Sequence, residues 1–419
     1  MISSQKCFTI IVIFATLLTI YLISYSVRKK SDSTSDHKPT LIKNSPLLGT
    51  LAKVKKITKC FDKTMEPQIT QRGQFFVLSN YVPASSQFKC HESITVTTQG
   101  DFTFIENLLP LVERWQGPVS VALYAPGTDF DRTVASIRYL RECTNHIIEK
   151  FVTFHIFFET EHTPETVSWP EGAFDCAQNP PFRESSAQTY KAENDLVYPI
   201  NVGRNVAREM ATTHFVLALD IELFPNPGFI PKFLDMIARD EPPLDRPYPR
   251  VFPLPVFEIK SGEKIPENKS QLREMLDKNL AIYFHKDICY SCHKIPKFDQ
   301  WKRLNESQNF GVFRVVKRIH EHKHWEPFYV GTNAEPLYDE RLSWEGRRNK
   351  MTNGFILCVL DYDLMVLDNA FLVHRPGIKE KSAKNERRSK LVKETNKLIE
   401  QRILPEMKVL YGFKDGCIV

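Results

Sequence analysis

The chain has 419 residues, of which 42% are hydrophobic, 11% aromatic and 25% charged. This composition excludes a disordered or fibrous protein and leaves enough apolar residues to bury a sizeable core. The 56 basic and 50 acidic residues give a net charge of only +6. That modest charge, without a dominant basic stripe or a nucleic-acid-binding motif, argues against a dedicated nucleic-acid-binding protein, so no nucleic acid is expected among its partners.

Residues 8–27 form an uncharged, mostly apolar segment, FTIIVIFATLLTIYLISYSV. At about 1.5 Å per residue such a segment spans a hydrocarbon core of about 30 Å, which predicts one transmembrane helix acting as an uncleaved signal-anchor. A cleaved signal peptide is the alternative, but its apolar part is usually roughly 7–15 residues long, and no small-x-small cleavage site follows here. Residues 1–7 would then be a short cytoplasmic tail.

Two sets of features favour opposite orientations of this anchor. Arg28, Lys29 and Lys30 follow the segment, so the positive-inside rule would place the large domain in the cytosol. Eight of the nine cysteines lie after the anchor, with two N-x-S glycosylation sequons at Asn268 and Asn305, and both features fit an oxidising lumen. We therefore expect a lumenal domain with glycans on both asparagines.

The remainder of the chain predicts a stem followed by one folded domain. Residues 28–66 are expected to be the stem, because the stretch to about Lys63 is rich in Lys, Ser, Thr and Pro and lacks apolar periodicity. In residues 67–419, short β-rich runs alternate with helical patterns, which predicts an α/β fold with a Rossmann-like, mainly parallel sheet and helices on both faces. These runs cover residues 94–98, 102–115, 119–124, 130–147, 151–158, 201–211 and 215–219.

Ligands of open α/β sheets bind beyond the carboxyl ends of strands, so the turns after Thr98 and Leu219 are where a site is expected. The second turn is the sharpest local feature, because an apolar run there ends in Asp220 and Glu222. Neighbouring carboxylates repel each other and lose solvation, and a divalent cation would offset that cost. Such oxygen ligands suit Mg²⁺ or Mn²⁺, which could neutralise the diphosphate of a nucleotide-sugar. An acid pair in an exposed turn is the simpler alternative.

A predicted helix upstream of this turn carries four polar residues on one face. Asn201, Arg204, Asn205 and Arg208 lie three or four positions apart, which is the spacing of neighbours on a helix surface. A polar, cationic face beside an acidic strand end suits a phosphate and sugar ligand. Any one of these residues alone would more often be a surface ion-pair partner.

Three further segments have interpretations that do not involve a metal or a phosphate ligand. Residues 325–374 are aromatic and polar, and they are expected to complete the pocket beside the sheet. The tail from Lys379 to Arg402 predicts a surface helix with a solvated basic face rather than a lipid or polyanion site. Cys289 and Cys292, in the string CYSCH, lack a second ligand pair, which favours a disulfide or packed cysteines over haem or zinc. The glycine-rich nucleotide fingerprints GxGxxG and GxxxxGK[ST] are absent.

Four long stretches resemble glycosyltransferase family 49, the family of beta-1,4-glucuronyltransferase and the C-terminal domain of LARGE. They are YPINVGRNVAREM (198–210), THFVLALDIELFPNPGFIPKFLDMI (213–237), WEPFYVGTNAEPLYDERLSWEG (325–346) and VLDNAFLVHRPGIK (366–379). The similarity spans nearly all of residues 90–410 in the same order. The resemblance implies a type II Golgi membrane enzyme with a GT-A fold that uses Mn²⁺ and UDP-glucuronate to extend a xylose-bearing glycan with inversion at the anomeric carbon.

The resemblance also implies metal ligands. Asp220 and Glu222 stand at the family's D-x-D motif, and His374 stands at its late metal-ligand histidine. Glu222 departs from the motif by one methylene group, which moves the carboxylate by about a bond length but still supplies an oxygen ligand.

Inverting transfer needs a base that takes the proton of the acceptor hydroxyl. Asp339 or Glu340 is the candidate from the family's acidic string, although a helix cap or an ion pair with the following arginine explains that string equally well. A glucuronate donor also needs a cation for its carboxylate, which Arg204, Arg208 or Lys350 could supply.

These expectations describe a Mn²⁺-dependent, inverting glucuronyltransferase of the Golgi lumen that acts on O-mannosyl-type glycans such as those of dystroglycan. Its partners would be a UDP-sugar, a glycan or glycoprotein acceptor and the membrane. Within the same class, UDP-N-acetylglucosamine is the alternative donor, for beta-1,3 transfer. A hypothesis of a different class is a non-catalytic, glycan-binding partner of other Golgi glycosyltransferases, since glutamate in place of the second aspartate of the D-x-D motif is compatible with lost activity. Metal-dependent hydrolysis would need more acidic or histidine ligands than the sequence offers.

Overall fold

The computed structural model describes residues 46–183, 189–379 and 385–419. The chain divides into two units, residues 1–49 and 50–419, and the fold given below is that of the second unit. The predicted anchor at 8–27 and the predicted cytoplasmic tail lie outside the described residues. Within the described ranges, no helix is both long and apolar enough to cross a membrane.

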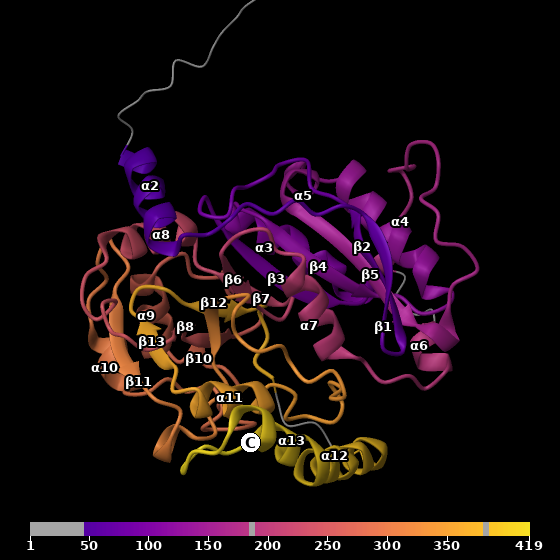
Figure 1. Ribbon diagram of the computed structural model, residues 1–419. Coiled ribbons are helices and arrows are strands. Elements are labelled where there is room, and N and C mark those ends of the chain that lie inside the picture. The colour runs from indigo at the N-terminus through magenta and orange to yellow at the C-terminus, as the bar shows by residue number, and fades with distance from the viewer. Residues whose placement is uncertain (1–45, 184–188, 380–384) are drawn as a thin grey trace, which may run out of the picture. The chain divides into compact units, whose positions relative to one another are not determined.

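A large mixed sheet forms the centre of the domain (Figure 1). Its strand order is β1-β2-β5-β4-β3-β6-β12-β8-β13-β11. The strands are β1 (Gln68–Arg72), β2 (Phe75–Val82), β3 (Ile94–Gly100), β4 (Val119–Tyr124), β5 (Val152–Glu159), β6 (Phe215–Ala218), β8 (Arg250–Leu254), β11 (Val312–Val316), β12 (Phe328–Thr332) and β13 (Asp363–Leu367). The middle run β5-β4-β3-β6 is parallel, as is the pair of β8 and β13.

The other strand pairs in this sheet are antiparallel, so the prediction of an α/β fold with parallel strands holds for its middle rather than for its whole width. Between β1 and β2 the reason is local, because only Gly73 and Gln74 connect them, and a two-residue turn joins antiparallel neighbours. Gly73 has φ +56°, a conformation that glycine adopts without a steric penalty.

Helices cover both faces of the parallel strands, as predicted. Val121 and Leu123 of β4 face the main core, to which α3, α4, α5 and α8 contribute, whereas Ala122 and Tyr124 face α7. These helices are α3 (Leu108–Trp115), α4 (Asp129–Glu142), α5 (Ile147–Phe151), α7 (Ile200–Glu209) and α8 (Phe229–Arg239). A Cβ on Gly203 would lie 2.9 Å from the Cβ of Gln99, so this glycine lets α7 pack closely against β3.

A second, smaller sheet has the strand order β10-β9-β14-β7. Its strands are β7 (Leu223–Pro225), β9 (Val256–Ile259), β10 (Ala281–Tyr283) and β14 (Leu372–His374). Strands β9, β10 and β14 contribute to a second apolar core, together with α9 (Lys269–Asp277) and α10 (Phe298–Arg303). Because β7 starts directly after Glu222 and β14 ends at His374, this sheet brings the two ends of the predicted metal motif together.

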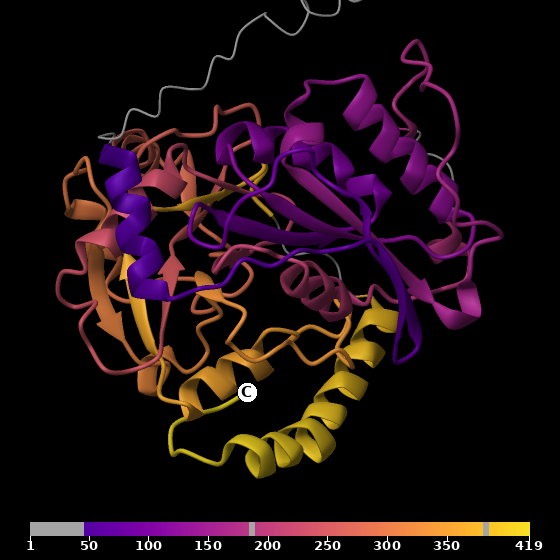
Figure 2. The same ribbon diagram turned by 45° about the horizontal axis from the view of Figure 1, so that its top comes forward.

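The C-terminal helices, drawn in yellow in Figure 2, follow α11 (Met351–Val359). The predicted basic tail helix is α12 (Glu386–Leu398), which has no fully buried side chain. A π-helix, Ile399–Ile403, continues it into α13 (Leu404–Tyr411). Buried Ile399 and Ile403 pack with residues of α11 in a third apolar cluster, so the chain after α12 is part of the folded domain.

A described helix lies before residue 67, inside the range expected to be the stem. Helix α2 (Pro46–Thr58) places fully buried Val54 in the main core, and Leu51 packs against that core. A disulfide between Cys60 and Cys90 then joins the following segment to the domain. The sequence hides this helix, because its two buried positions lie among lysines and polar residues and give no clear period.

All eight cysteines of residues 46–419 form disulfides. The pairs are Cys60–Cys90, Cys143–Cys176, Cys289–Cys292 and Cys358–Cys417. The disulfide interpretation of the CYSCH string is therefore confirmed. Complete pairing is the pattern of a domain that folds in an oxidising compartment.

Candidate active site

The predicted acid turn lies at the carboxyl end of β6, between the two sheets. The backbone N–H of Leu219 donates to the carbonyl of Thr97 in β3, and Asp220, Ile221 and Glu222 then lead into β7. In the small sheet His374 pairs with Leu223, the residue after Glu222. As a result Nε2 of His374 lies 3.6 Å from Oε2 of Glu222.

The imidazole of His374 is held in one tautomer. Its Nδ1 lies 2.8 Å from the carbonyl oxygen of Arg375, so Nδ1 carries the proton and donates it. Nε2 therefore presents its lone pair, and this buried atom has no hydrogen-bond partner. A histidine whose second nitrogen is fixed by a carbonyl and whose free nitrogen faces a carboxylate is arranged as metal-binding histidines usually are.

Glu222 is surrounded by positive charge. Nε of Arg375 lies 2.9 Å from its Oε1, and Nζ of Lys379 lies 3.8 Å from its Oε2. Burial raises the pKa of Glu222, but the adjacent imidazole of His374 and the charges of Lys379 and Arg375 outweigh burial and lower it. The carboxylate is thus ionised at neutral pH, which is the form that binds a cation.

Asp220 turns toward α7 rather than toward the pair of Glu222 and His374. Nη2 of Arg204 lies 2.9 Å from its Oδ1, and Nε2 of Gln99 lies 3.5 Å from the same oxygen. Burial would raise the pKa of Asp220, but the charges of Arg204 and Lys350 and the hydrogen bond from Arg204 lower it to about 2. Asp220 is therefore a permanent anion paired with a buried arginine.

The three predicted metal ligands come from elements that converge, but they do not form a closed cage. Among the described residues, the one group of three potential ligands whose atoms all lie within 4.8 Å of one another is Cys60, Cys90 and His91, and both of its sulfurs are in a disulfide. Glu222 and His374 face each other, whereas Asp220 is held by Arg204. Two carboxylates and a neutral imidazole still form a donor set that suits Mn²⁺.

The four polar residues of α7 hold a loop instead of facing an open ligand site. Asn201 donates to the carbonyls of Asp339 and Asn349 at 2.8 and 2.9 Å, and Asn205 both donates to the carbonyl of Tyr338 and accepts from its N–H. Arg208 donates to the carbonyls of Thr332, Glu335 and Pro336. Of the four residues, Arg204 is the one that contacts a member of the acid turn, and it also donates to Asn349 Oδ1 at 2.7 Å.

The two acids proposed as the base are both paired with arginines. Oδ2 of Asp339 accepts from Arg341 at 2.6 Å. Oε1 of Glu340 accepts from Arg72 and from Asn205, each at 2.7 Å. No contact joins either carboxylate to the acid turn in the described residues, so their role as base remains a prediction from the resemblance.

The family model described as "Glycosyl-transferase for dystroglycan" matches residues 93–412. The chain belongs to this family, glycosyltransferase family 49. Among curated proteins, beta-1,4-glucuronyltransferase 1 of Danio rerio is 28% identical over 324 residues, 72% of each chain. The Homo sapiens protein of that name is 25% identical over 346 residues, 78% of this chain and 80% of the relative. Homo sapiens xylosyl- and glucuronyltransferase LARGE1 is 22% identical over 84% of this chain but 40% of its own.

A solved structure, S. aureus TarS 1-349 in complex with UDP-GlcNAc, also matches, with a TM-score of 0.28 and 11% identity over 76% of this chain and 75% of that one. A similarity this low supports no statement about the site. The relatives, by contrast, establish that the chain is a glycosyltransferase.

In this glycosyltransferase, Lys350 lies on the Asp220 side of the site. Its Nζ is 3.7 Å from the ring centroid of Phe328. Burial lowers the pKa of Lys350, and the charge of Asp220 opposes that shift. The role of Lys350 in binding an anionic part of the donor remains a prediction.

Four residues of the site were not predicted from the sequence. Arg375 and Lys379, which surround Glu222, stand inside a stretch quoted for the resemblance but had no role assigned. Glu258 and His285 lie at the same edge of the small sheet. Glu258 could have been found, because it is a lone acid in the apolar run VFPLPVFEI, and a buried acid of this kind needs a partner or a function.

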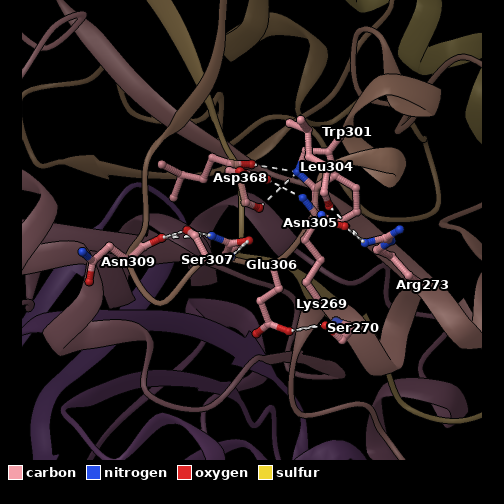
Figure 3. Close-up of polar contacts among 12 residues, drawn as sticks. Lys269, Ser270, Arg273, Trp301, Leu304, Asn305, Glu306, Ser307, Asn309 and Asp368 are labelled. Atoms are coloured by element: carbon pink, nitrogen blue, oxygen red, sulfur yellow. Dashed lines mark hydrogen bonds and ion pairs between the residues drawn. The ribbon is translucent and has the colours of Figure 1, made fainter.

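The sequons of the two predicted glycosylation sites lie close to each other, with Ser270 of the first beside Glu306 of the second (Figure 3). Asn268 accepts from the N–H of Gln271 at 2.9 Å and so caps α9. Exposed Asn305 accepts from Arg273 at 3.2 Å. The hydroxyl of Ser270, in the first sequon, donates to Glu306 in the second sequon at 2.7 Å. Glycan attachment at both asparagines remains a prediction.

Proposed function

We propose that the chain is a Mn²⁺-dependent, inverting glucuronyltransferase with a GT-A fold, which transfers glucuronate from UDP-glucuronate to a xylose-bearing O-mannosyl-type glycan of the dystroglycan kind. The observation that carries the proposal is the Glu222 and His374 pair, separated by 3.6 Å, with the unpartnered Nε2 of His374 directed at the carboxylate. The relatives named for glucuronyl transfer support the choice of donor. The predicted anchor supports a single-pass type II protein of the Golgi membrane with this domain in the lumen.

Each part of the site has a task in this reaction. Glu222 and His374, with Asp220 after a turn of its side chain, would hold the cation. When bound, Mn²⁺ neutralises charge on the leaving diphosphate. Arg375 and Lys379 surround the same corner and suit diphosphate oxygens.

The donor's own carboxylate needs a separate cation. Lys350 meets this need near Asp220, because its side chain is partly buried and has no carboxylate within ion-pair distance among the described residues. Arg204 is less available, since Asp220, Asn201 and Asn349 already accept its N–H groups. We therefore assign the recognition of the glucuronate carboxylate to Lys350.

A donor panel tests the proposal. The purified lumenal domain is incubated with a xyloside acceptor and each of several UDP-sugars, with Mn²⁺ or with a chelator, and released UDP is measured. We expect turnover with UDP-glucuronate that requires the metal and is lost in His374→Gln. The control is His146→Gln, whose side chain is 92% exposed and distant from the acid turn in sequence. If no UDP-sugar is turned over, the proposal is rejected. If UDP-N-acetylglucosamine alone is turned over, it is the donor in place of UDP-glucuronate.

One observation favours a second candidate, a non-catalytic partner of other Golgi glycosyltransferases. Asp220 is paired with Arg204, and its carboxylate does not join Glu222 and His374 within metal-binding distance. Thermal shift with UDP distinguishes the candidates. An enzyme binds UDP in a Mn²⁺-dependent way and melts at a higher temperature with both present, whereas a scaffold without a metal site does not.

A further inference from the structure

One edge of the small sheet carries a row of titratable side chains, one from each strand or from the turn beside it. From β7 to β10 the row is Glu222, His374, Glu258 and His285. In β14 and β9, His374 and Glu258 each follow by one residue the paired residues Val373 and Phe257. The first two members form the proposed metal corner, and the last two have no role in it.

Glu258 is a buried acid with unused hydrogen-bonding capacity. The residue has 0% exposure, and its Oε2 has no hydrogen-bond partner. Oε1 accepts from the backbone N–H of His285 at 3.4 Å and lies 4.0 Å from Nε2 of the same residue. An unpartnered carboxylate oxygen inside a protein costs stability, so its retention beside a histidine indicates a function.

His285 is held in a constrained but reachable position. Its ring stacks on Phe284 with centroids 3.8 Å apart and meets His293 edge-on at 5.3 Å, yet 26% of its side chain stays exposed. The backbone has φ +57°, a left-handed conformation that costs energy for a residue with a Cβ. Such strain is often found where a side chain must be aimed at a reacting group.

We propose that His285 is the base that accepts the proton of the acceptor hydroxyl, and that Glu258 is the positioning residue that orients its ring. This inference rests on the proposed function. Nε2 faces Glu258, so Nδ1 is the nitrogen left for the substrate. The separation of 4.0 Å is longer than a hydrogen bond, and such contacts in free enzymes tighten when substrate binds.

In the proposed transfer step, one bond forms at the anomeric carbon and one bond to it breaks. The hydroxyl oxygen of the acceptor forms a bond to the anomeric carbon while the bond from that carbon to the diphosphate oxygen breaks. The bonding electron pair leaves with UDP, and the hydroxyl proton passes to Nδ1 of His285. The resulting imidazolium faces the carboxylate of Glu258, which stabilises it.

Other groups of the site also act on His285. They are Glu258 and His293, which face the ring, and Lys379, Lys350, Asp220 and His374, whose charges reach it. Burial lowers the pKa of His285 to about 3, with Lys379 and Lys350 adding to the effect. The imidazole is therefore neutral at neutral pH, the form that can accept a proton. Asp339 and Glu340 are less available to accept a proton, because arginines already donate to their carboxylates.

The test compares His285→Gln, Glu258→Gln and the exposed control His146→Gln in the donor assay, with Mn²⁺-dependent UDP binding measured in parallel. We expect kcat of His285→Gln to fall by about 100-fold or more, which is the usual contribution of a general base, while UDP binding and the KM for the donor stay within about threefold. Glu258→Gln should lower kcat by about tenfold while the KM for the donor and Mn²⁺-dependent UDP binding stay within about threefold, because a glutamine amide cannot stabilise the imidazolium as a carboxylate does. The control should match the wild type.

Four outcomes overturn the inference in distinguishable ways. If wild-type protein turns over but His285→Gln keeps at least a third of its kcat, the base lies elsewhere. Loss of UDP binding together with kcat in His285→Gln would make it a donor-binding residue. A wild-type kcat in Glu258→Gln rejects the positioning role. If the wild-type protein turns over no donor, the proposed function is rejected, and the assignment of His285 as its base is rejected as well.

Discussion

The guanidinium of Arg204 lies 2.9 Å from Oδ1 of Asp220 and ties the acid turn to the helix that clamps residues 332–349. The Arg204 side chain is 5% exposed, whereas that of Asp220 is 35% exposed. The arginine is therefore the fixed member of the pair and the aspartate the one that solvent, a cation or a donor can reach. Because the two side chains differ in exposure, mutations at Arg204 and at Asp220 should have different effects.

Asp220→Ala should abolish Mn²⁺-dependent turnover while the protein stays folded. The change removes a proposed metal ligand, and Arg204 keeps its contacts with Asn201 and with Asn349. We expect the free energy of unfolding to fall by about 3 kcal/mol, since the hydrogen bonds from Arg204 and Gln99 are lost and the buried guanidinium loses its charge partner. UDP release and a thermal melt measure both effects. Full activity in this variant would show that the turn is not the site.

Asn205→Ala should destabilise the loop rather than weaken donor binding. Its amide exchanges two hydrogen bonds with the backbone of Tyr338 and donates to Glu340, and the residue is 1% exposed. Leaving buried backbone groups unpaired costs about 1–3 kcal/mol. We expect faster limited proteolysis within residues 332–349 and unchanged affinity for UDP. Asn194→Ala is the control, because its side chain bonds to Tyr190 on an exposed surface. A large loss of UDP affinity would restore the ligand-binding interpretation of α7.

The sequence predicted the elements between residues 94 and 219 but not the contacts between them. The run ending at Leu219 and the acids after it could be placed because strand burial and chain order depend on local pattern. His374 required the resemblance, since only the pairing of β14 with β7 brings it to Glu222. The polar face of α7 was recognised correctly, but a helix face can be covered by a distant loop, and sequence spacing does not distinguish a loop from a ligand. Glu258 differs from these residues, because a lone acid in an apolar run is a signal that the sequence itself carries.

Loss of the Cys358–Cys417 disulfide should destabilise the domain far more than loss of Cys289–Cys292. The first pair closes a separation of 59 residues and the second a separation of 3. In the chain-entropy model these loops correspond to about 4 and about 1.5 kcal/mol, respectively. Paired Cys→Ser variants compared by chemical denaturation measure the difference. Equal losses would mean that the loop around Cys289 contributes through its contacts rather than through chain entropy.

His155 should make the domain less stable in mild acid. It is fully buried and accepts from the N–H of Asn80 through Nδ1, so Nε2–H donates to Ser120. Burial lowers its pKa from 6.5 to about 3. The unfolded chain therefore binds one more proton than the folded chain between these values, and stability that is complete above pH 6.5 is lost as the pH falls, by about 1.4 kcal/mol per pH unit.

Denaturation midpoints of wild type and His155→Gln, measured from pH 7.5 to about 5, isolate this contribution from those of the other histidines. Glutamine can accept and donate in the same places but does not titrate, so the variant should lose stability less steeply. Parallel curves for the two proteins would assign the acid sensitivity to other groups.

Glycans at Asn268 and Asn305 would establish that this domain is lumenal. Attachment uses Nδ2, so a glycan at Asn268 leaves Oδ1 free to cap α9 through the N–H of Gln271. We expect two steps of gel mobility after limited glycosidase treatment. Ser270→Ala and Ser307→Ala should each remove one step, because each destroys a sequon without changing its asparagine.

The choice of variant at the first sequon separates modification from helix capping. Asn268→Gln removes both the acceptor and the cap, so it should cost about 1 kcal/mol more than Ser270→Ala, which keeps the cap and loses a contact with Glu306 on the surface. Denaturation of the two enzymatically deglycosylated proteins measures that difference without interference from the glycan. A wild-type band that glycosidase leaves unshifted would contradict the lumenal placement, and with it the Golgi assignment.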